Sequence, residues 1–285
     1  MKPQVKAFFH KPTFTYTYVV YDGKNPQCAL IDPVLDFDYK SGRTSHESAD
    51  QVIQWIQENQ LELSWILETH AHADHITGAK YFQQQLGGEI AIGDHIHLVQ
   101  GVFKKVFNYG DEFIANGQQF DRLLGDNITL PLGALEIKVL HTPGHTPACV
   151  SYDIGGNLFV GDTLFMPDVG TARCDFPGGD AATLYDSIQM LLSYPDETAL
   201  YMCHDYPPER EARYMCTVAE QKQDNIHVGR GTSKADFVAM RSSRDATLEM
   251  PALILPSIQI NIRAGELPDA EDNGTSYLKL PLNMF

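Results

Sequence analysis

A histidine-rich segment directly after an apolar run is the feature that most constrains this chain. Three histidines and one aspartate occupy six positions from His70 to His75, after the apolar residues 65–67. The apolar run predicts a buried strand and residues 76–86 predict a helix, so these side chains lie where a strand ends and a helix begins. Imidazole and carboxylate groups together favour zinc, iron or manganese over magnesium or calcium. The segment therefore predicts a metal-binding loop.

Length and charge limit the partners that this chain can have. Its 285 residues, 43% of them hydrophobic, suffice to bury the core of one large domain. The formal net charge of -16, without a cluster of Lys and Arg, disfavours nucleic acid and anionic membranes as partners. Five cysteines without a C-x-x-C pair are typical of a reducing compartment. With no stretch that would span a bilayer and no apolar signal segment, we expect a cytoplasmic protein that acts on small molecules.

The spacing of hydrophobic residues predicts sheets covered by helices. Residues 14–21 and 28–31 form an expected hairpin, and Thr44 with Glu47 has the spacing of a capping box at the start of a helix. Further strands are expected at 63–68, 90–92, 135–140, 149–152, 158–160 and 199–202, and further helices at 76–86, 96–107, 181–192, 209–223 and 234–243. Strands that follow one another, with helices on both sides, indicate a layered α/β fold. Because residues 253–262 are too apolar for water, we expect one domain, 1–285, with an ordered C-terminal extension over about 245–285.

Three more ligand-type residues stand at predicted strand ends later in the chain. His145 lies in a Pro-Gly turn, Asp162 follows a glycine, and His204 follows the strand at 199–202. Polar side chains at strand ends gather at one pole of layered α/β folds. We therefore expect these three residues to meet the histidine-rich loop in one metal site.

The ordered set of these motifs resembles the metallo-β-lactamase superfamily, over roughly residues 5–210. The motifs are T-H-x-H-x-D-H at 69–75, H-T-P-G-H-T at 141–146, G-D at 161–162 and C-H-D-Y at 203–206. The resemblance implies an αββα sandwich, with mixed sheets and helices on both outer faces. Most members of the superfamily hydrolyse esters, thioesters or lactams with two zinc ions, so the fold alone does not determine the reaction.

Two further segments are similar to the persulfide dioxygenases, a branch related to glyoxalase II that oxidises a low-molecular-weight persulfide to sulfite with dioxygen in sulfide detoxification. They are G-T-A-R-C-D-F at 170–176, with Tyr185 after it, and the tail 255–283. The resemblance implies that Arg173 and Asp175 lie near the metal and that Arg173 and Tyr185 approach the thiol substrate. Arg173 would hold a substrate carboxylate through two hydrogen bonds.

For the metal, the resemblance implies one Fe(II) per chain, held by His70, His145 and Asp162 with open positions for oxygen chemistry. The other polar residues of the motifs would then orient ligands and water, namely His72, Asp74, His75 and His204.

The same side chains would also serve a hydrolase with two zinc ions, in which a metal-bound hydroxide attacks a thioester or lactone carbonyl. One ion would take His70, His72, His145 and Asp162, and the other Asp74, His75, Asp162 and His204. The ligand inventory leaves both readings open, and only the segment around Arg173 and the tail favour the dioxygenase.

Some residues carry a more ordinary expectation. Cys203 is expected to point into the core, away from the metal pole. Arg241 and Arg244 lie on the last predicted helix, where they would contact an anionic substrate or lie on a solvated face, the second being the commoner role. The thiol that carries the persulfide is left open by the sequence, and a homodimer formed through the C-terminal tail is consistent with the family resemblance.

Overall fold

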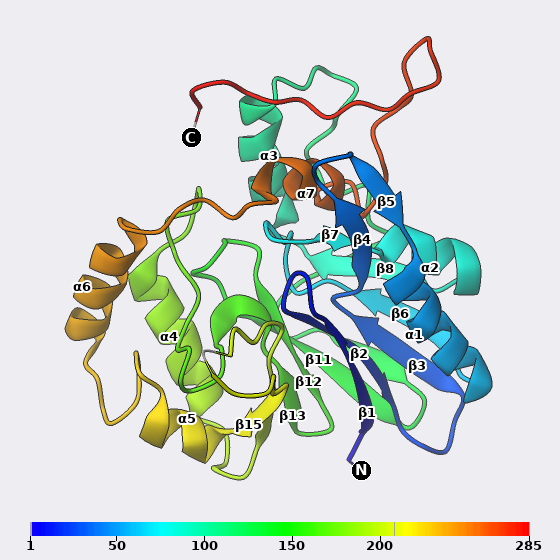
Figure 1. The fold of residues 1–285 in the computed structure, drawn as a ribbon. Helices are drawn as coiled ribbons and strands as arrows, with labels where there is room; N and C mark the ends of the chain where they lie inside the picture. The colour runs from blue at the N-terminus through cyan, green and yellow to red at the C-terminus, as the bar shows by residue number, and fades with distance from the viewer. Residues whose placement is uncertain (1, 208, 285) are drawn as a thin grey trace.

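Two six-stranded sheets stacked face to face, with helices outside each, make up the fold (Figure 1). The computed structural model describes residues 2–207 and 209–284. This arrangement confirms the αββα sandwich expected from the sequence. None of the described helices is long and apolar enough to cross a membrane.

The first sheet carries the N-terminal strands and the strand that leads into the histidine-rich loop. β1 to β3 pair antiparallel, whereas β3, β6, β8 and β9 pair parallel. In order across the sheet, the strands are β1 (Gln4–His10), β2 (Thr15–Tyr21), β3 (Gln27–Ile31), β6 (Glu62–Leu67), β8 (Glu89–Gly93) and β9 (Arg122–Leu124).

The second sheet is antiparallel except between β13 and β14. Its strands are β10 (Thr129–Leu132), β11 (Leu135–His141), β12 (Val150–Ile154), β13 (Asn157–Phe159), β14 (Ala199–Tyr201) and β15 (Met215–Thr217). A small third sheet joins β4 (Val34–Asp38) to β5 (Arg43–Ser45) and β7 (Ile76–Thr77).

A separate group of helices covers the outer face of each sheet. The helices on the first sheet are α1 (Glu47–Glu58), α2 (Ala79–Leu86), α3 (Ile96–Val106) and α7 (Ile254–Asn261). Those on the second sheet are α4 (Ala181–Leu192), α5 (Val218–Asp224) and α6 (Lys234–Asp245), and a 3-10 turn covers Gly161–Thr163.

The core between the sheets is aromatic. Along β2, Tyr16, Tyr18 and Val20 face the second sheet while Val19 faces the helices, as the two-residue period of a strand requires. The hydroxyl of the fully buried Tyr18 donates to the carbonyl of Met202, 2.5 Å away. This bond ties the first sheet to the chain just after β14.

The capping box predicted from Thr44 and Glu47 is wrong. Thr44 lies in β5, where it pairs with Phe37 of β4. The N-cap residue of α1 is His46, whose side chain makes no capping hydrogen bond. The hairpin of β5 with β4, directly before the helix, has taken the residue that local spacing assigned to the helix. A capping box does form at α5, between Thr217 and Glu220.

Two predicted helices begin later than expected. Ile76 and Thr77 pair with β4, so α2 starts only at Ala79. Residues 209–214 contain no helix and β15 pairs with β14, so the helix predicted over 209–223 is reduced to α5. In both places a short strand competes successfully for the start of the helix.

The C-terminal extension forms α7 and then runs over α3 without regular secondary structure (Figure 1). Gln259 exchanges two backbone hydrogen bonds of 2.9 Å with Lys279, which holds the last segment on α7. Leu280 and Leu282 stay exposed there. The homodimer through this tail stays a prediction.

Candidate metal centre

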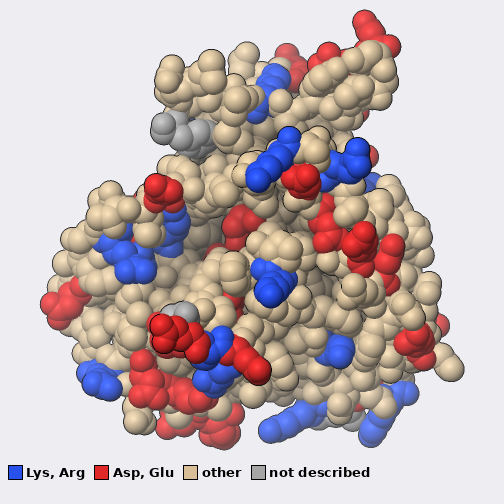
Figure 2. Space-filling model, viewed as in Figure 1, with Lys and Arg blue, Asp and Glu red and all other residues tan. Residues whose placement is uncertain are grey.

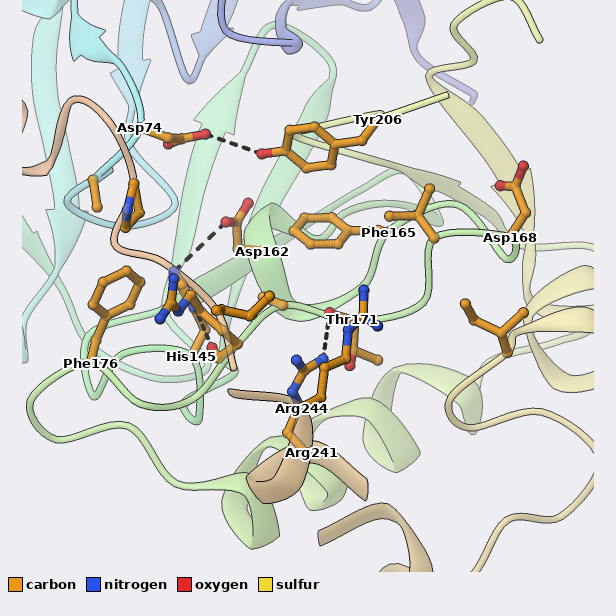
Figure 3. A pocket seen from close by; sticks show the side chains of 17 residues that line it. Asp74, His145, Asp162, Phe165, Asp168, Thr171, Phe176, Tyr206, Arg241 and Arg244 are labelled. Atoms are coloured by element: carbon orange, nitrogen blue, oxygen red, sulfur yellow. Dashed lines mark hydrogen bonds and ion pairs between the residues drawn. The ribbon is translucent and has the colours of Figure 1, made fainter. Parts of the chain in front are cut away.

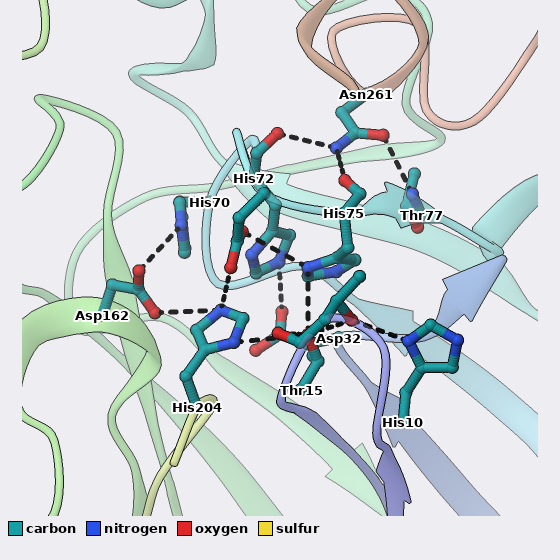
Figure 4. Close-up of polar contacts among 12 residues, drawn as sticks. His10, Thr15, Asp32, His70, His72, His75, Thr77, Asp162, His204 and Asn261 are labelled. Carbon is teal, nitrogen blue, oxygen red and sulfur yellow. Dashed lines mark hydrogen bonds and ion pairs between the residues drawn. The ribbon is translucent and has the colours of Figure 1, made fainter. Parts of the chain in front are cut away.

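The predicted ligands come from both sheets and meet at one end of the sandwich (Figure 4). The loop that starts at His70 follows β6 of the first sheet, whereas His145, Asp162 and His204 follow β11, β13 and β14 of the second. Because the ends of these strands lie at the same end of the sandwich, the side chains that follow them can reach a common point between the sheets.

One group consists of His70, His145 and Asp162, all buried. Both Nε2 atoms face the same carboxylate oxygen, Asp162 Oδ2, at 3.8 Å from His70 and 3.7 Å from His145. Nδ1 of His145 donates to the Arg173 carbonyl at 2.7 Å, and Nδ1 of His70 lies 3.0 Å from the Thr69 hydroxyl. These contacts orient both rings with Nε2 toward the centre.

The second group consists of His72, Asp74, His75 and His204. Nε2 of His204 lies 3.2 Å from Asp74 Oδ2 and 3.4 Å from Asp162 Oδ1. The two oxygens of Asp162 therefore face one group each. Nδ1 of His204 and of His75 lie 3.3 and 3.4 Å from the hydroxyl of Thr15, on β2.

The donor set fits a metal ion. Nε2 of His70, His75 and His204 and Oδ1 of Asp162 are buried and have no hydrogen-bond partner among the described residues. Burial and the neighbouring imidazoles hold the pKa of His70 well below its usual value and lower the pKa of His75 to about 3, so both rings are neutral and offer a lone pair. Burial raises the pKa of Asp162, which a bound cation would reverse. Buried atoms of this kind need a partner, and a cation supplies one.

His72 has carboxylates behind it that the sequence analysis did not assign. Its Nε2 lies 3.1 Å from Asp32 and 3.4 Å from Glu68. Burial alone would lower the pKa of His72, but these two carboxylates raise it well above its usual value. Asp32 also accepts the Thr69 N–H at 2.8 Å and thereby holds the start of the ligand loop.

Cys203 is buried, as predicted, but the predicted direction of its side chain is wrong. The ligand-type atoms of Asp32, His72 and Cys203 lie within 4.8 Å of one another, so the thiol lies beside the metal pole. Strand alternation does not extend to this residue, because β14 ends at Tyr201. Burial raises the pKa of the Cys203 thiol well above its usual value, so it packs as a protonated side chain.

A cavity of about 450 Å³ opens beside the metal centre, and Asp74, His145 and Asp162 form part of its wall (Figure 3). Apolar side chains dominate the remaining lining, including Phe165, Val169, Phe176, Ile226, Leu248 and Pro251. Figure 2 shows Lys and Arg atoms beside a hollow in this face, on the side where Figure 1 places α6. A cavity of this size takes a small organic molecule.

Residues 10–204 match the family model described as the metallo-beta-lactamase superfamily. The chain belongs to this superfamily. Its metal centre and αββα sandwich thus agree with the resemblance carried by the motifs.

Curated relatives and a solved structure match the chain over nearly its full length. A probable metallo-hydrolase of Burkholderia pseudomallei is 54% identical (98% of this chain, 99% of the relative), and glyoxylase B2 of Dictyostelium discoideum is 49% identical (99% and 98%). The mitochondrial persulfide dioxygenase ETHE1 of Homo sapiens is 30% identical (92% and 88%). The crystal structure of ETHE1 from Myxococcus xanthus matches with a TM-score of 0.74 at 29% identity, covering 92% of this chain and 100% of that one. The two relatives with 49–54% identity and the persulfide dioxygenases thus carry different names.

Three arginines line the cavity of this protein, and two of them are paired with carboxylates. Arg173 donates two hydrogen bonds of 2.6 Å to Asp175 and a third to the Glu249 carbonyl. Arg241 is 1% exposed and is paired with Asp245, which corrects its expected place on a solvated face. Arg244 is exposed, and no acidic group of the described residues lies within ion-pair distance of its guanidinium.

The structure brings Arg173 to the cavity but does not bring Asp175 and Tyr185 to its wall. Asp175 turns to Arg173. The hydroxyl of Tyr185 donates to the Thr232 carbonyl at 2.8 Å and its ring packs on Phe237, so Tyr185 joins α4 to α6. Packing between these helices explains this tyrosine, and its predicted approach to the substrate is not seen.

Sequence reasoning missed several residues around the site. Asp32 stands at a strand end before a proline, the same signal that identified the ligands, and could have been found by it. Tyr206, in the C-H-D-Y motif, donates to Asp74 at 3.2 Å and lines the cavity. Asn261 offered no local signal, because only packing brings its helix to the site. From the sequence, a substrate contact of Arg244 is expected only as the less common of two roles.

Proposed function

We propose that this protein is an iron-dependent persulfide dioxygenase, which oxidises a low-molecular-weight persulfide, such as glutathione persulfide, with dioxygen to sulfite and the free thiol. The observation that carries the proposal is the grouping of the ligands. His70, His145 and Asp162 form a set without His72, which groups with Asp74, His75 and His204 instead. A set of two histidines and one carboxylate with open positions is typical of non-haem iron oxygenases.

His70, His145 and Asp162 would hold the Fe(II) ion, which would supply the electrons for the reaction with dioxygen. The chain's own residues supply the surroundings. Phe165 and Phe176 limit the access of water to the cavity beside Asp162. Tyr206, hydrogen-bonded to Asp74, holds the opposite wall in place.

Arg244 takes the substrate role that the sequence analysis gave to Arg173. Small thiols such as glutathione carry carboxylates, and a guanidinium binds a carboxylate through two parallel hydrogen bonds. The guanidinium of Arg173 donates to Asp175 and to the Glu249 carbonyl, whereas Arg244 lines the cavity. The substrate would thus lie with its anionic end at α6 and its sulfur at the metal ligands.

Oxygen uptake tests the proposal. Protein loaded anaerobically with Fe(II) should consume one O2 for each glutathione persulfide, with one sulfite and one glutathione as products and one water molecule consumed. Oxygen uptake without sulfite, or none from protein shown to contain iron, would contradict the proposal.

A binuclear hydrolase of thioesters or lactones is the second candidate. Two observations favour it: the second group of candidate ligands, and the position of Asp162 between the two groups. In a two-metal site, a carboxylate in this position can bridge the two ions. The names of the two most similar relatives quoted above point the same way. Zinc-loaded protein with two ions per chain that hydrolyses S-lactoylglutathione without oxygen would establish this activity.

A further inference from the structure

Helix α7 of the C-terminal extension lies directly on the ligand loop (Figure 4). Its Ile260 packs with Ile76 and Leu35, immediately after the loop and in the neighbouring β4. Gly265, just beyond the helix at φ 86°, approaches the Thr77 carbonyl so closely that an added Cβ would lie 3.3 Å from it. The extension and the loop therefore pack without space for another side chain.

Asn261, the last residue of α7, makes three hydrogen bonds to the backbone of this loop. Its Nδ2 donates to the carbonyls of His72 and His75, both at 2.8 Å. Its Oδ1 accepts the N–H of Thr77 at 2.9 Å. The side chain is 3% exposed, so water does not replace these bonds readily.

Only an amide satisfies this arrangement. An aspartate would keep the bond from the N–H of Thr77 but would place a carboxylate against two carbonyl oxygens, and an aliphatic side chain would leave all three backbone groups without a partner. The two carbonyls belong to His72 and His75 themselves. Their position in the loop determines where both imidazoles can point.

We propose that Asn261 is a positioning residue of the metal centre, through which the C-terminal extension sets the geometry of the ligand loop. Its three bonds hold the backbone from His72 to Thr77 at a fixed distance from α7, so the imidazoles meet the metal without a cost for ordering the loop. The inference concerns metal binding and holds for an oxygenase and a hydrolase alike.

Helix α7 supplies a matched control. The side chain of Gln259, 1% exposed, donates to the carbonyls of Leu255 and Lys279. Its Oε1 accepts from the Lys279 N–H and from the Tyr109 hydroxyl, and a glutamate would keep both accepted bonds. Asn261→Asp and Gln259→Glu each remove two donated bonds, keep an accepted backbone N–H and add one buried carboxylate on the same helix. They differ in that only Asn261 contacts the ligand loop.

The test compares Co(II)-loaded wild type, Asn261→Asp and Gln259→Glu. Asn261→Asp should release cobalt to a chelator at least about tenfold faster than the wild type and should change the visible absorption of the bound ion, since loss of a residue behind the ligands lowers metal affinity by about 10–100-fold. Gln259→Glu should lose thermal stability but keep the wild-type release rate and spectrum. Equal release rates and spectra for Asn261→Asp and wild type, or equal changes in both variants, would overturn the proposal.

Asn261→Ser guards against misfolding of the aspartate variant, because it adds no charge and leaves room for water at the two carbonyls. It should release cobalt faster than Gln259→Glu, with a spectrum between those of the wild type and Asn261→Asp. A serine variant that folds and retains cobalt as the wild type does would equally overturn the proposal. None of these measurements depends on persulfide oxidation, so a failure here is distinct from a failure of the proposed function.

Discussion

At the level of single residues, the arginines of the cavity differ in the partners they already have. The guanidinium of Arg173 is fully engaged, and that of the buried Arg241 donates to Asp245 and to the Thr171 carbonyl. A buried guanidinium held by a carboxylate serves the fold, since breaking such a pair leaves an uncompensated charge. Arg244 alone of the three is exposed at the cavity and has no acidic partner among the described residues.

Arg244→Gln should therefore weaken substrate binding. We expect KM for glutathione persulfide to rise about tenfold with kcat nearly unchanged, because an exposed charge-assisted hydrogen bond contributes about 1.5 kcal/mol. The measurement is steady-state oxygen uptake. Arg122→Gln is the matched control, since Arg122 is an exposed arginine paired with Glu89 away from the cavity. A kcat that falls as much as kcat/KM would argue against a role in binding the substrate anion.

His227 should make stability depend on pH. Its Nδ1 accepts the Thr171 N–H at 3.0 Å, and burial, assisted by Arg241 and Arg244, lowers the pKa of His227 to about 4. Because the folded protein binds this proton less readily than the unfolded chain, the contribution is complete above about pH 6.5 and is lost as the pH falls toward 4. His227→Asn keeps an acceptor without titrating. The difference in Tm between wild type and variant should therefore shrink from pH 7 to pH 4.5, and a constant difference would contradict this.

At the level of elements, residues 246–253 connect α6 to α7 across the edge of the cavity, where Leu248 and Pro251 belong to the wall. Arg173 donates to the Glu249 carbonyl in the middle of this connection, at 2.6 Å. The carbonyl of Arg173 in turn accepts from His145. Arg173 thus links the candidate ligand His145 to the segment at the edge of the cavity. The role predicted for Arg173 from the sequence, binding the substrate, does not include this link.

Arg173→Gln should loosen this connection. Loss of the bond to the Glu249 carbonyl removes a contact that holds residues 246–253, so limited proteolysis should cut there several-fold faster than in the wild type. Mass spectrometry of the fragments locates the cut. Lys234→Gln, which removes an exposed pair with Asp186 at the start of α6, should leave the cleavage rate unchanged. Faster cutting in the lysine variant would show that α6 as a whole had loosened.

Elements with local signals were predicted well. Helix α4 has the predicted bounds 181–192, with Asp180 capping its first turn and one apolar face. The starts of α1, α2 and α5 were misplaced, because the residues before them form β5, β7 and β15. β5 pairs in a local hairpin with β4, whereas the partners of β7 and β15 lie more than ten residues away, outside the window in which helical spacing is read.

At the level of the whole molecule, the metal centre joins the two sheets. The ligand loop follows β6 of the first sheet, and the other ligands follow strands of the second. A bound ion would therefore cross-link the sandwich at the end where buried histidines face one another. Helix α7 packs into the hydrophobic cluster of the first sheet, which places the C-terminal extension in the same assembly.

Metal removal should consequently lower stability of the entire fold. A ligand that binds only the folded state at about 1,000 times its Kd contributes about 4 kcal/mol, which corresponds to about 10 °C in Tm for a chain of this size. Differential scanning calorimetry with and without a chelator, under anaerobic conditions, measures the shift. Asp162→Ala, which removes the carboxylate shared by both groups, should show no response to the chelator. An equal response in this variant would place the stabilising ion elsewhere.

The sequence by itself determined the superfamily and the layered fold and predicted the candidate ligands. These depend on local order, in which a polar residue follows an apolar strand several times along the chain. Only the tertiary structure decided which arginine is available to a substrate, that Tyr185 joins two helices, and that Asn261 holds a loop 184 positions before it in the chain. The physical reason is that a side chain's role depends on which groups already satisfy its hydrogen bonds and charge, and those groups are brought together by packing.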